Sequence, residues 1–95
     1  MINVEVTEEF AAWQRNLRDQ RAARKVAITI ERLEDGLGDI KPAGGPVSEV
    51  RIDYGPGYRL YLTRRGGTLI ILLCGGDKGS QDRDIRKAQK MAAEL

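Results

Sequence analysis

The chain has 95 residues, which is enough for a single domain over residues 1–95 with one modest core. Its composition, 41% hydrophobic and 32% charged, excludes a disordered chain, and its longest apolar run, residues 69–74, is far too short to span a bilayer. The N-terminus lacks the basic and then apolar pattern of a signal peptide, so a cytoplasmic protein with no membrane contact is expected.

The first elements along the chain are a short strand and two helices. Residues 2–6 alternate apolar and polar side chains, as a strand does. Thr7 is a suitable N-cap for a helix whose apolar face is expected to lie in the core and consists of Phe10, Trp13 and Leu17. Asp19 is a suitable N-cap for a second helix. Because the two helices are nearly contiguous, we expect a helical hairpin packed on a sheet.

The remaining elements are strands and a last helix. Residues 37–47 are rich in glycine and proline and are expected to form a surface loop. Residues 49–54 and 59–63 alternate around the turn YGPGY, which predicts a β-hairpin, and residues 68–74 are apolar on both faces, which predicts a central strand. Ser80 is expected to cap the last helix. The predicted fold is α+β, in the order β-α-α-β-β-β-α, with a mostly antiparallel sheet.

Several kinds of chemistry are excluded by composition. The chain has no histidine and one cysteine, so a histidine-based site or a zinc site is not expected, and no metal or cofactor is predicted. Cys74 lies in the most apolar run and is interpreted as a buried, inert thiol rather than a nucleophile.

The segment GGDKGS follows an apolar strand and opens a helix, but Lys78 is followed by Gly79, so the spacing does not fit a phosphate-binding loop. It is either a flexible turn or a place where Lys78 and the free amides at the helix start bind one phosphate.

Basic and phenolic side chains stand out in the predicted hairpin. If Leu60 and Leu62 face inward, strand alternation places Arg59, Tyr61 and Thr63 on the other face, and the same rule places Arg51 and Asp53 outward. Arg51 and Arg59 are therefore expected on one open sheet face, where two guanidinium groups suit phosphate and a tyrosine suits stacking or proton transfer. The alternative is a solvated face with an Arg51–Asp53 pair.

The charge distribution points the same way as this hairpin. Residues 48–95 carry nine Lys and Arg against six Asp and Glu, whereas residues 1–47 carry seven against eight. On charge alone a solvated face is the favoured interpretation, and the positive excess is only a modest indication of an anionic partner for the second half of the chain.

The motif RIDYGPGYRLYL, followed by LIILLCGGDKGSQDRDI and preceded by TIERLEDGLGDIKPAGGPVSEVRI, resembles the addiction-module killer proteins. These form the HigB-like branch of the RelE/ParE toxin superfamily of type II toxin–antitoxin systems, and the resemblance covers nearly the whole chain. It implies a RelE/ParE-like fold. It also implies either a ribosome-dependent mRNA endoribonuclease or a non-enzymatic inhibitor of a protein such as DNA gyrase; a degenerate interaction module is the third alternative.

The resemblance also implies roles for particular residues. Arg59 resembles the central-strand arginine of the nuclease site, and Arg51 and Lys78 resemble its flanking basic residues. Attack of a ribose 2′-OH on the adjacent phosphate needs fixed positive charge but no metal. Because histidine is absent and no tyrosine follows residue 61, proton transfer is assigned to Tyr54, Tyr61 or a lysine. The implied partners are the ribosome, mRNA and a cognate antitoxin of the helix-turn-helix type, bound in a heteromeric complex.

Overall fold

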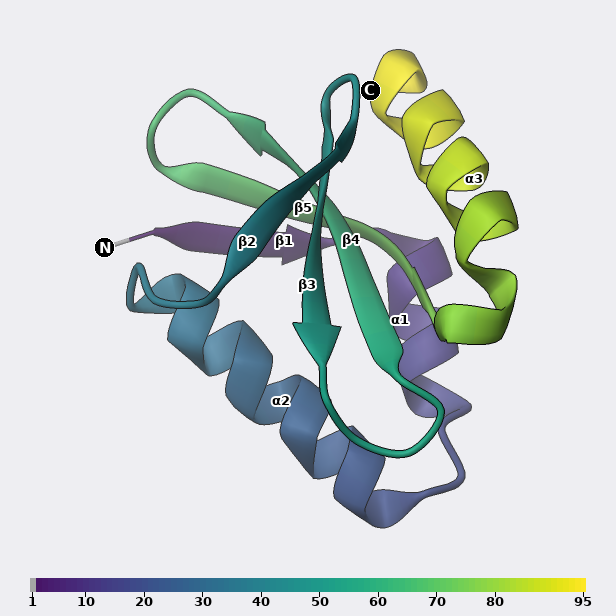
Figure 1. Cartoon of the computed structure of the whole chain (residues 1–95). Coiled ribbons are helices and arrows are strands. Elements are labelled where there is room, and N and C mark those ends of the chain that lie inside the picture. The colour runs from purple at the N-terminus through teal and green to yellow at the C-terminus, as the bar shows by residue number, and fades with distance from the viewer. Residues whose placement is uncertain (1) are drawn as a thin grey trace.

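The computed structural model describes residues 2–95. Its centre is a five-stranded sheet (Figure 1). The strand order is β1-β5-β4-β3-β2; β1 is parallel to β5, and the other neighbours are antiparallel. The predicted α+β class and mostly antiparallel sheet are confirmed. In chain order the elements are β1 Asn3–Val6, α1 Glu8–Arg15, α2 Gln20–Glu34, β2 Ile40–Gly44, β3 Val47–Ile52, β4 Tyr58–Arg65, β5 Leu69–Gly76, the short 3₁₀ helix η1 Lys78–Ser80 and α3 Gln81–Glu94.

Two of the three predicted helix caps form as expected. The Thr7 hydroxyl accepts from the backbone N–H of Phe10, and the Asp19 carboxylate accepts from two N–H groups in the first turn of α2. Ser80 precedes α3, but its side chain makes no capping bond to the helix backbone. Ser80 therefore occupies the predicted N-cap position of α3, but its hydroxyl donates to the carboxylate of Asp84, one turn into the helix, in place of a capping bond.

The expected loop over residues 37–47 is wrong, because Ile40–Gly44 forms the edge strand β2. Ile40 pairs with Val50, and the register shifts between Pro42 and Gly44. An edge strand tolerates this composition, because the missing N–H of a proline need not face a neighbour and a glycine is common at a bulge. The sheet therefore has one strand more than the sequence predicted.

Helices cover both faces of the sheet. One face packs against α1 and α2 through a core that consists of Phe10, Val26, Leu33, Val50, Ile52, Leu60, Leu62, Ile70 and Leu72. Trp13 packs against this core as predicted, with its ring centroid 5.5 Å from that of Phe10. The other face packs against α3, and Figure 1 shows α2 and α3 on opposite sides of the sheet. Among residues 2–95, no helix combines the length and the hydropathy needed to cross a membrane.

The face that carries Tyr61 was expected to be open, and this expectation is wrong. Helix α3 lies over it, and Tyr61 joins a second core with Val47, Leu73, Cys74, Ala88 and Ala92. Tyr61 and Thr63 are buried, and the Thr63 hydroxyl donates to the carbonyl of Pro46. The end of β3 and β4 that lies beside η1 borders a hollow and remains accessible to a ligand.

Candidate functional site

The three basic residues singled out by sequence line one hollow. Arg51, Arg59 and Lys78 border a cavity of about 280 Å³ at the end of β3 and β4, together with Ile52, Asp53, Gly57 and Tyr58. Arg51 and Arg59 are direct partners across the two strands, so the prediction that they share a sheet face is confirmed. Lys78 comes from η1, which follows β5. Two strands and a short helix thus converge on this place, which we call the arginine hollow.

A buried carboxylate beneath the hollow holds both arginines. Glu49 is only 4% exposed and accepts a hydrogen bond of 2.8 Å from Nε of Arg51. Its Oε2 atom also lies 3.6 Å from Nε of Arg59. The hydrogen bond and the negative charge of Glu49 raise the pKa of Arg51. The alternative of an Arg51–Asp53 pair is wrong, because Arg51 binds the carboxylate of Glu49.

Arg59 is the best fixed of the three cations. Its side chain is buried, and Nη1 donates to the carbonyl of Gly57 at 2.9 Å. Gly57 has a φ of +78°, a conformation that glycine adopts without strain, and a Cβ atom there would lie 3.5 Å from Nη1 of Arg59. Nε of Arg59 has no hydrogen-bond partner among residues 2–95. A strand, a turn and a buried carboxylate therefore set the position of this guanidinium group.

Tyr61 lies two residues further along β4, beneath α3. Its side chain is fully buried, and its hydroxyl has no hydrogen-bond partner within residues 2–95. Burial raises the pKa of Tyr61 to about 12, and the nearby carboxylates of Glu49 and Asp84 act in the same direction. In this structure the hydroxyl does not reach the surface of the arginine hollow, and it holds its proton at neutral pH.

Tyr54 does not line the arginine hollow. Its ring packs against the core that faces α1 and α2, and its hydroxyl donates to the carboxylate of Asp19 at 2.8 Å. The ammonium group of Lys25 lies 5.3 Å from the ring centroid. The hydrogen bond to Asp19 raises the pKa of Tyr54, since that carboxylate favours the protonated phenol. These contacts tie Tyr54 to the start of α2.

The turn GGDKGS contains only part of the phosphate site that was one of the two interpretations of its sequence. The amide of Gly79 donates to the carboxylate of Asp77 at 2.8 Å, so this amide already has an anionic partner within the turn. Lys78 remains exposed and lines the arginine hollow. It also borders a second, shallower depression of about 400 Å³ at the start of α3, which includes Arg83 and Arg86. Lys78 therefore stands between two neighbouring cationic surfaces.

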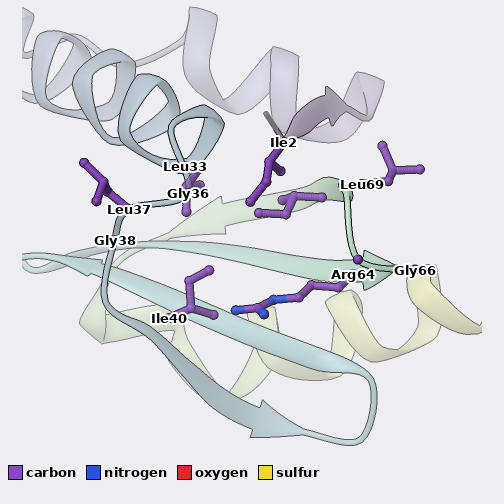
Figure 2. Close-up of a pocket in the computed structure, with 11 residues that line it drawn as sticks. Ile2, Leu33, Gly36, Leu37, Gly38, Ile40, Arg64, Gly66 and Leu69 are labelled. Atoms are coloured by element: carbon purple, nitrogen blue, oxygen red, sulfur yellow. The ribbon is translucent and has the colours of Figure 1, made fainter.

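A third hollow, of about 140 Å³, lies at the opposite end of β4 (Figure 2). Aliphatic side chains from the residue before β1, from α2, from the loop that follows α2, and from β2 and β5 surround it; they belong to Ile2, Leu33, Leu37, Ile40, Leu69 and Ile70. Among residues 2–95, Arg64 is the one charged residue that lines it. A single cation among aliphatic groups lacks the paired positive charge that a phosphate in reaction needs, so we do not take this hollow as the candidate site.

Residues suited to metal or thiol chemistry do not gather at a site. Within residues 2–95, no three side chains of His, Cys, Asp or Glu are grouped as metal ligands. Cys74 is buried, and its thiol lies 3.7 Å from the carbonyl of Asp84. Burial raises the pKa of Cys74 to about 12, so the thiol stays protonated. The prediction of a buried thiol is confirmed.

Glu49 is the residue that the sequence reasoning missed. Strand alternation already places it on the face of Arg51, two residues away. The sequence does show that Glu49 is two residues before Arg51 on the same strand, but Asp53 lies two residues after Arg51 and is therefore equally close along the chain. Only the three-dimensional structure shows that Glu49 is buried and also lies next to Arg59.

Comparison with known proteins adds a relative. No model of a known protein family matches the chain. A protein of Haemophilus influenzae (strain KW20/Rd), described as an uncharacterized protein, is 46% identical over 95 residues, covering 99% of this chain and 96% of the relative. The chain belongs to the family of that protein. Because the description of the relative assigns no activity, the functional argument rests on the arginine hollow.

Proposed function

We propose that the protein is the toxin of a type II toxin–antitoxin module and acts in the cytoplasm as a ribosome-dependent mRNA endoribonuclease. The observation that carries the proposal is the convergence of Arg51, Arg59 and Lys78 on one hollow, with Arg59 fixed on a strand. The sequence resemblance to HigB-like RelE/ParE toxins supplies the reaction class.

The proposed step is attack of a ribose 2′-OH on the adjacent phosphate. The O2′–P bond forms while the P–O5′ bond breaks, which leaves a 2′,3′-cyclic phosphate and a 5′-hydroxyl. Negative charge builds up on the phosphorane, and preorganised cations lower its energy more than they lower that of the ground state. Arg59 supplies a planar donor on a rigid element, while Arg51 and Lys78 supply charge at the rim.

Proton transfer is the weakest part of the site. Tyr61 is buried with a raised pKa, and the hydroxyl of Tyr54 is bound to Asp19 at the start of α2. Of the groups proposed from sequence for this step, only Lys78 borders the hollow. A site that is rich in charge but poor in acid and base groups suits an enzyme whose substrate is aligned by the ribosome, because alignment alone supplies much of a rate enhancement.

The same charge explains the proposed control. An antitoxin, proposed to be of the helix-turn-helix type, would bind the toxin in a heteromeric complex and present carboxylates to Arg51 and Lys78, which are exposed. Expression of the neighbouring reading frame should then restore growth, and persistent toxicity while that protein is demonstrably present would contradict the pairing.

The test is controlled expression in a bacterial host with sequencing of mRNA ends. The wild type should arrest growth and produce new 5′ ends inside translated frames. Arg51→Ala and Lys78→Ala should each lower cleavage by about 100-fold, the loss typical of one charge-stabilising donor. Arg64→Ala is the matched control, because Arg64 is an exposed arginine at the far end of β4. Growth arrest without new mRNA ends would refute the nuclease and leave an inhibitor of a protein target.

A further inference from the structure

An unpaired carboxylate lies in the arginine hollow. Asp53 borders it together with Arg51, Arg59 and Lys78, and it is exposed. Within residues 2–95 it makes no salt bridge; Arg51 and Arg59 lie with Glu49 instead. A carboxylate repels phosphate, so a hollow that served phosphate alone would be weakened by Asp53. Its presence points to a ligand that also carries hydrogen-bond donors.

The backbone holds Asp53 in place. The N–H of Tyr54 donates to the carbonyl of Ile52 at 2.9 Å, which closes a three-residue turn centred on Asp53. Tyr54 is itself anchored through its hydroxyl to Asp19, and Ile52 is buried in the core. The carboxylate therefore projects from a fixed point beside the cations. Arg51 and Asp53 are two residues apart, which is roughly 6–7 Å along an extended chain.

An ionised carboxylate accepts hydrogen bonds through two parallel oxygens and donates none. Guanine presents two adjacent donors on one edge, the ring N1–H and the 2-amino group. Adenine and cytosine each present one amino group beside a ring nitrogen that is an acceptor, and uracil presents one N–H between two carbonyls. Guanine is thus the base whose edge a carboxylate matches with two bonds.

We propose that Asp53 selects guanine at the nucleotide whose phosphate lies against Arg51, Arg59 and Lys78. This inference rests on the proposed function for its biological substrate, but it concerns a binding preference that is measurable without the ribosome. One nucleotide would satisfy both halves of the hollow, with its phosphate on the cations and its base edge on Asp53. The carboxylate sets the identity of the base, and the cations hold the phosphate whatever the base is.

The test compares guanosine and inosine 5′-monophosphates, because hypoxanthine, the base of inosine, differs from guanine by the missing 2-amino group. Each nucleotide is titrated into the purified protein and followed by NMR. The wild type should bind the guanosine nucleotide at least about fivefold more tightly, the lower end of what one bidentate pair contributes. Asp53→Asn, which keeps the shape but replaces one acceptor by a donor, should abolish this preference.

Asp82→Asn is the matched control, since Asp82 is an exposed aspartate beside the neighbouring depression and its loss changes the net charge equally. It should leave the fivefold preference intact. Equal binding of the two nucleotides by the wild type, or an unchanged preference in Asp53→Asn, would overturn the inference.

Mapping of mRNA ends separates this inference from the proposed function. If both hold, guanine is enriched at one position beside the cut in the wild type, and the enrichment is lost in Asp53→Asn. If the wild type prefers the guanosine nucleotide but cuts no mRNA, the nuclease proposal fails and the guanine site stands. If mRNA is cut with no base preference, the guanine site fails and the nuclease stands.

Discussion

Replacement of Arg59 by alanine should destabilise the protein severely, because it uncouples a buried ion pair. The side chains of Arg59 and Glu49 are 7% and 5% exposed, and their charged atoms lie 3.6 Å apart. Loss of Arg59 leaves the Glu49 carboxylate buried with one exposed partner and also leaves the carbonyl of Gly57 without its donor. Breaking a buried pair from one side costs about 3–5 kcal/mol. A chain of 95 residues has a free energy of unfolding of roughly 5–14 kcal/mol, so the loss is a large fraction of the total.

Urea unfolding followed by the fluorescence of Trp13, the single tryptophan, measures this loss. For a small domain, a loss of about 3 kcal/mol lowers the midpoint by on the order of 1–3 M. Arg51→Ala is the matched comparison, because Arg51 binds the same carboxylate at 2.8 Å while its side chain is 54% exposed. It should cost far less stability than Arg59→Ala, because solvent screens the exposed pair.

Two results would refute the idea that burial makes the Arg59–Glu49 pair important for stability. One is an equal loss of stability in the Arg59 and Arg51 variants, and the other is a change of less than about 0.5 kcal/mol in the free energy of unfolding of Arg59→Ala. The double variant Arg59→Met with Glu49→Gln removes both charges together. It should lose less stability than the two single variants combined, since neither charge is then left buried alone.

Three further predictions test the surroundings of the site. Tyr61→Phe should leave the free energy of unfolding unchanged or raise it by up to about 1 kcal/mol, because the hydroxyl that it removes is buried without a hydrogen-bond partner. Urea titrations measure this, and a loss of more than about 1 kcal/mol would contradict it. Gly75→Ala should cost about 1–3 kcal/mol, since its Cβ would approach the Trp13 ring, whereas Gly67→Ala, which meets nothing within 4 Å, should be nearly neutral in thermal melts. Cys74 ionises near pH 9 when unfolded and near 12 when folded, so its contribution to stability is full below pH 9 and is lost as pH rises towards 12. In Cys74→Ala the melting temperature should fall less steeply between pH 9 and pH 12 than in the wild type. The same steepness in both proteins would refute the idea that ionisation of the buried thiol contributes to the loss.

The sequence predicted the faces of the hairpin correctly because strand alternation is a property of the backbone. Leu60 and Leu62 face the core with α1 and α2, and Arg51 and Arg59 share the other face. Strand β2 was missed, because its proline and glycine are typical of loops and only its pairing with β3 makes it a strand. Local composition does not show that pairing.

The extent to which the site residues are buried could not be predicted from the sequence either. Alternation shows which side of β4 Tyr61 occupies but not that α3, twenty residues later, returns to cover that side. In the same way Glu49 and Asp53 are equally close to Arg51 along the chain. The choice between them depends on Arg59 across the ladder and on burial, both of which come from contacts distant in sequence.

The arrangement divides two roles among the cations. Glu49 neutralises the buried charge of Arg59, and this pairing lets a guanidinium group sit rigidly at the base of the arginine hollow. Arg51, although its Nε is bound to Glu49, and Lys78 are both exposed, so an anionic ligand can replace water at their charged groups. If the proposed nuclease activity is correct, loss of Arg59 should reduce both the stability of the fold and mRNA cleavage, whereas loss of Lys78 should reduce cleavage alone. A Lys78 variant with the melting temperature of the wild type and no mRNA cleavage would then show that the charge acts in the reaction and not in folding. An Arg59 variant alone does not make this distinction.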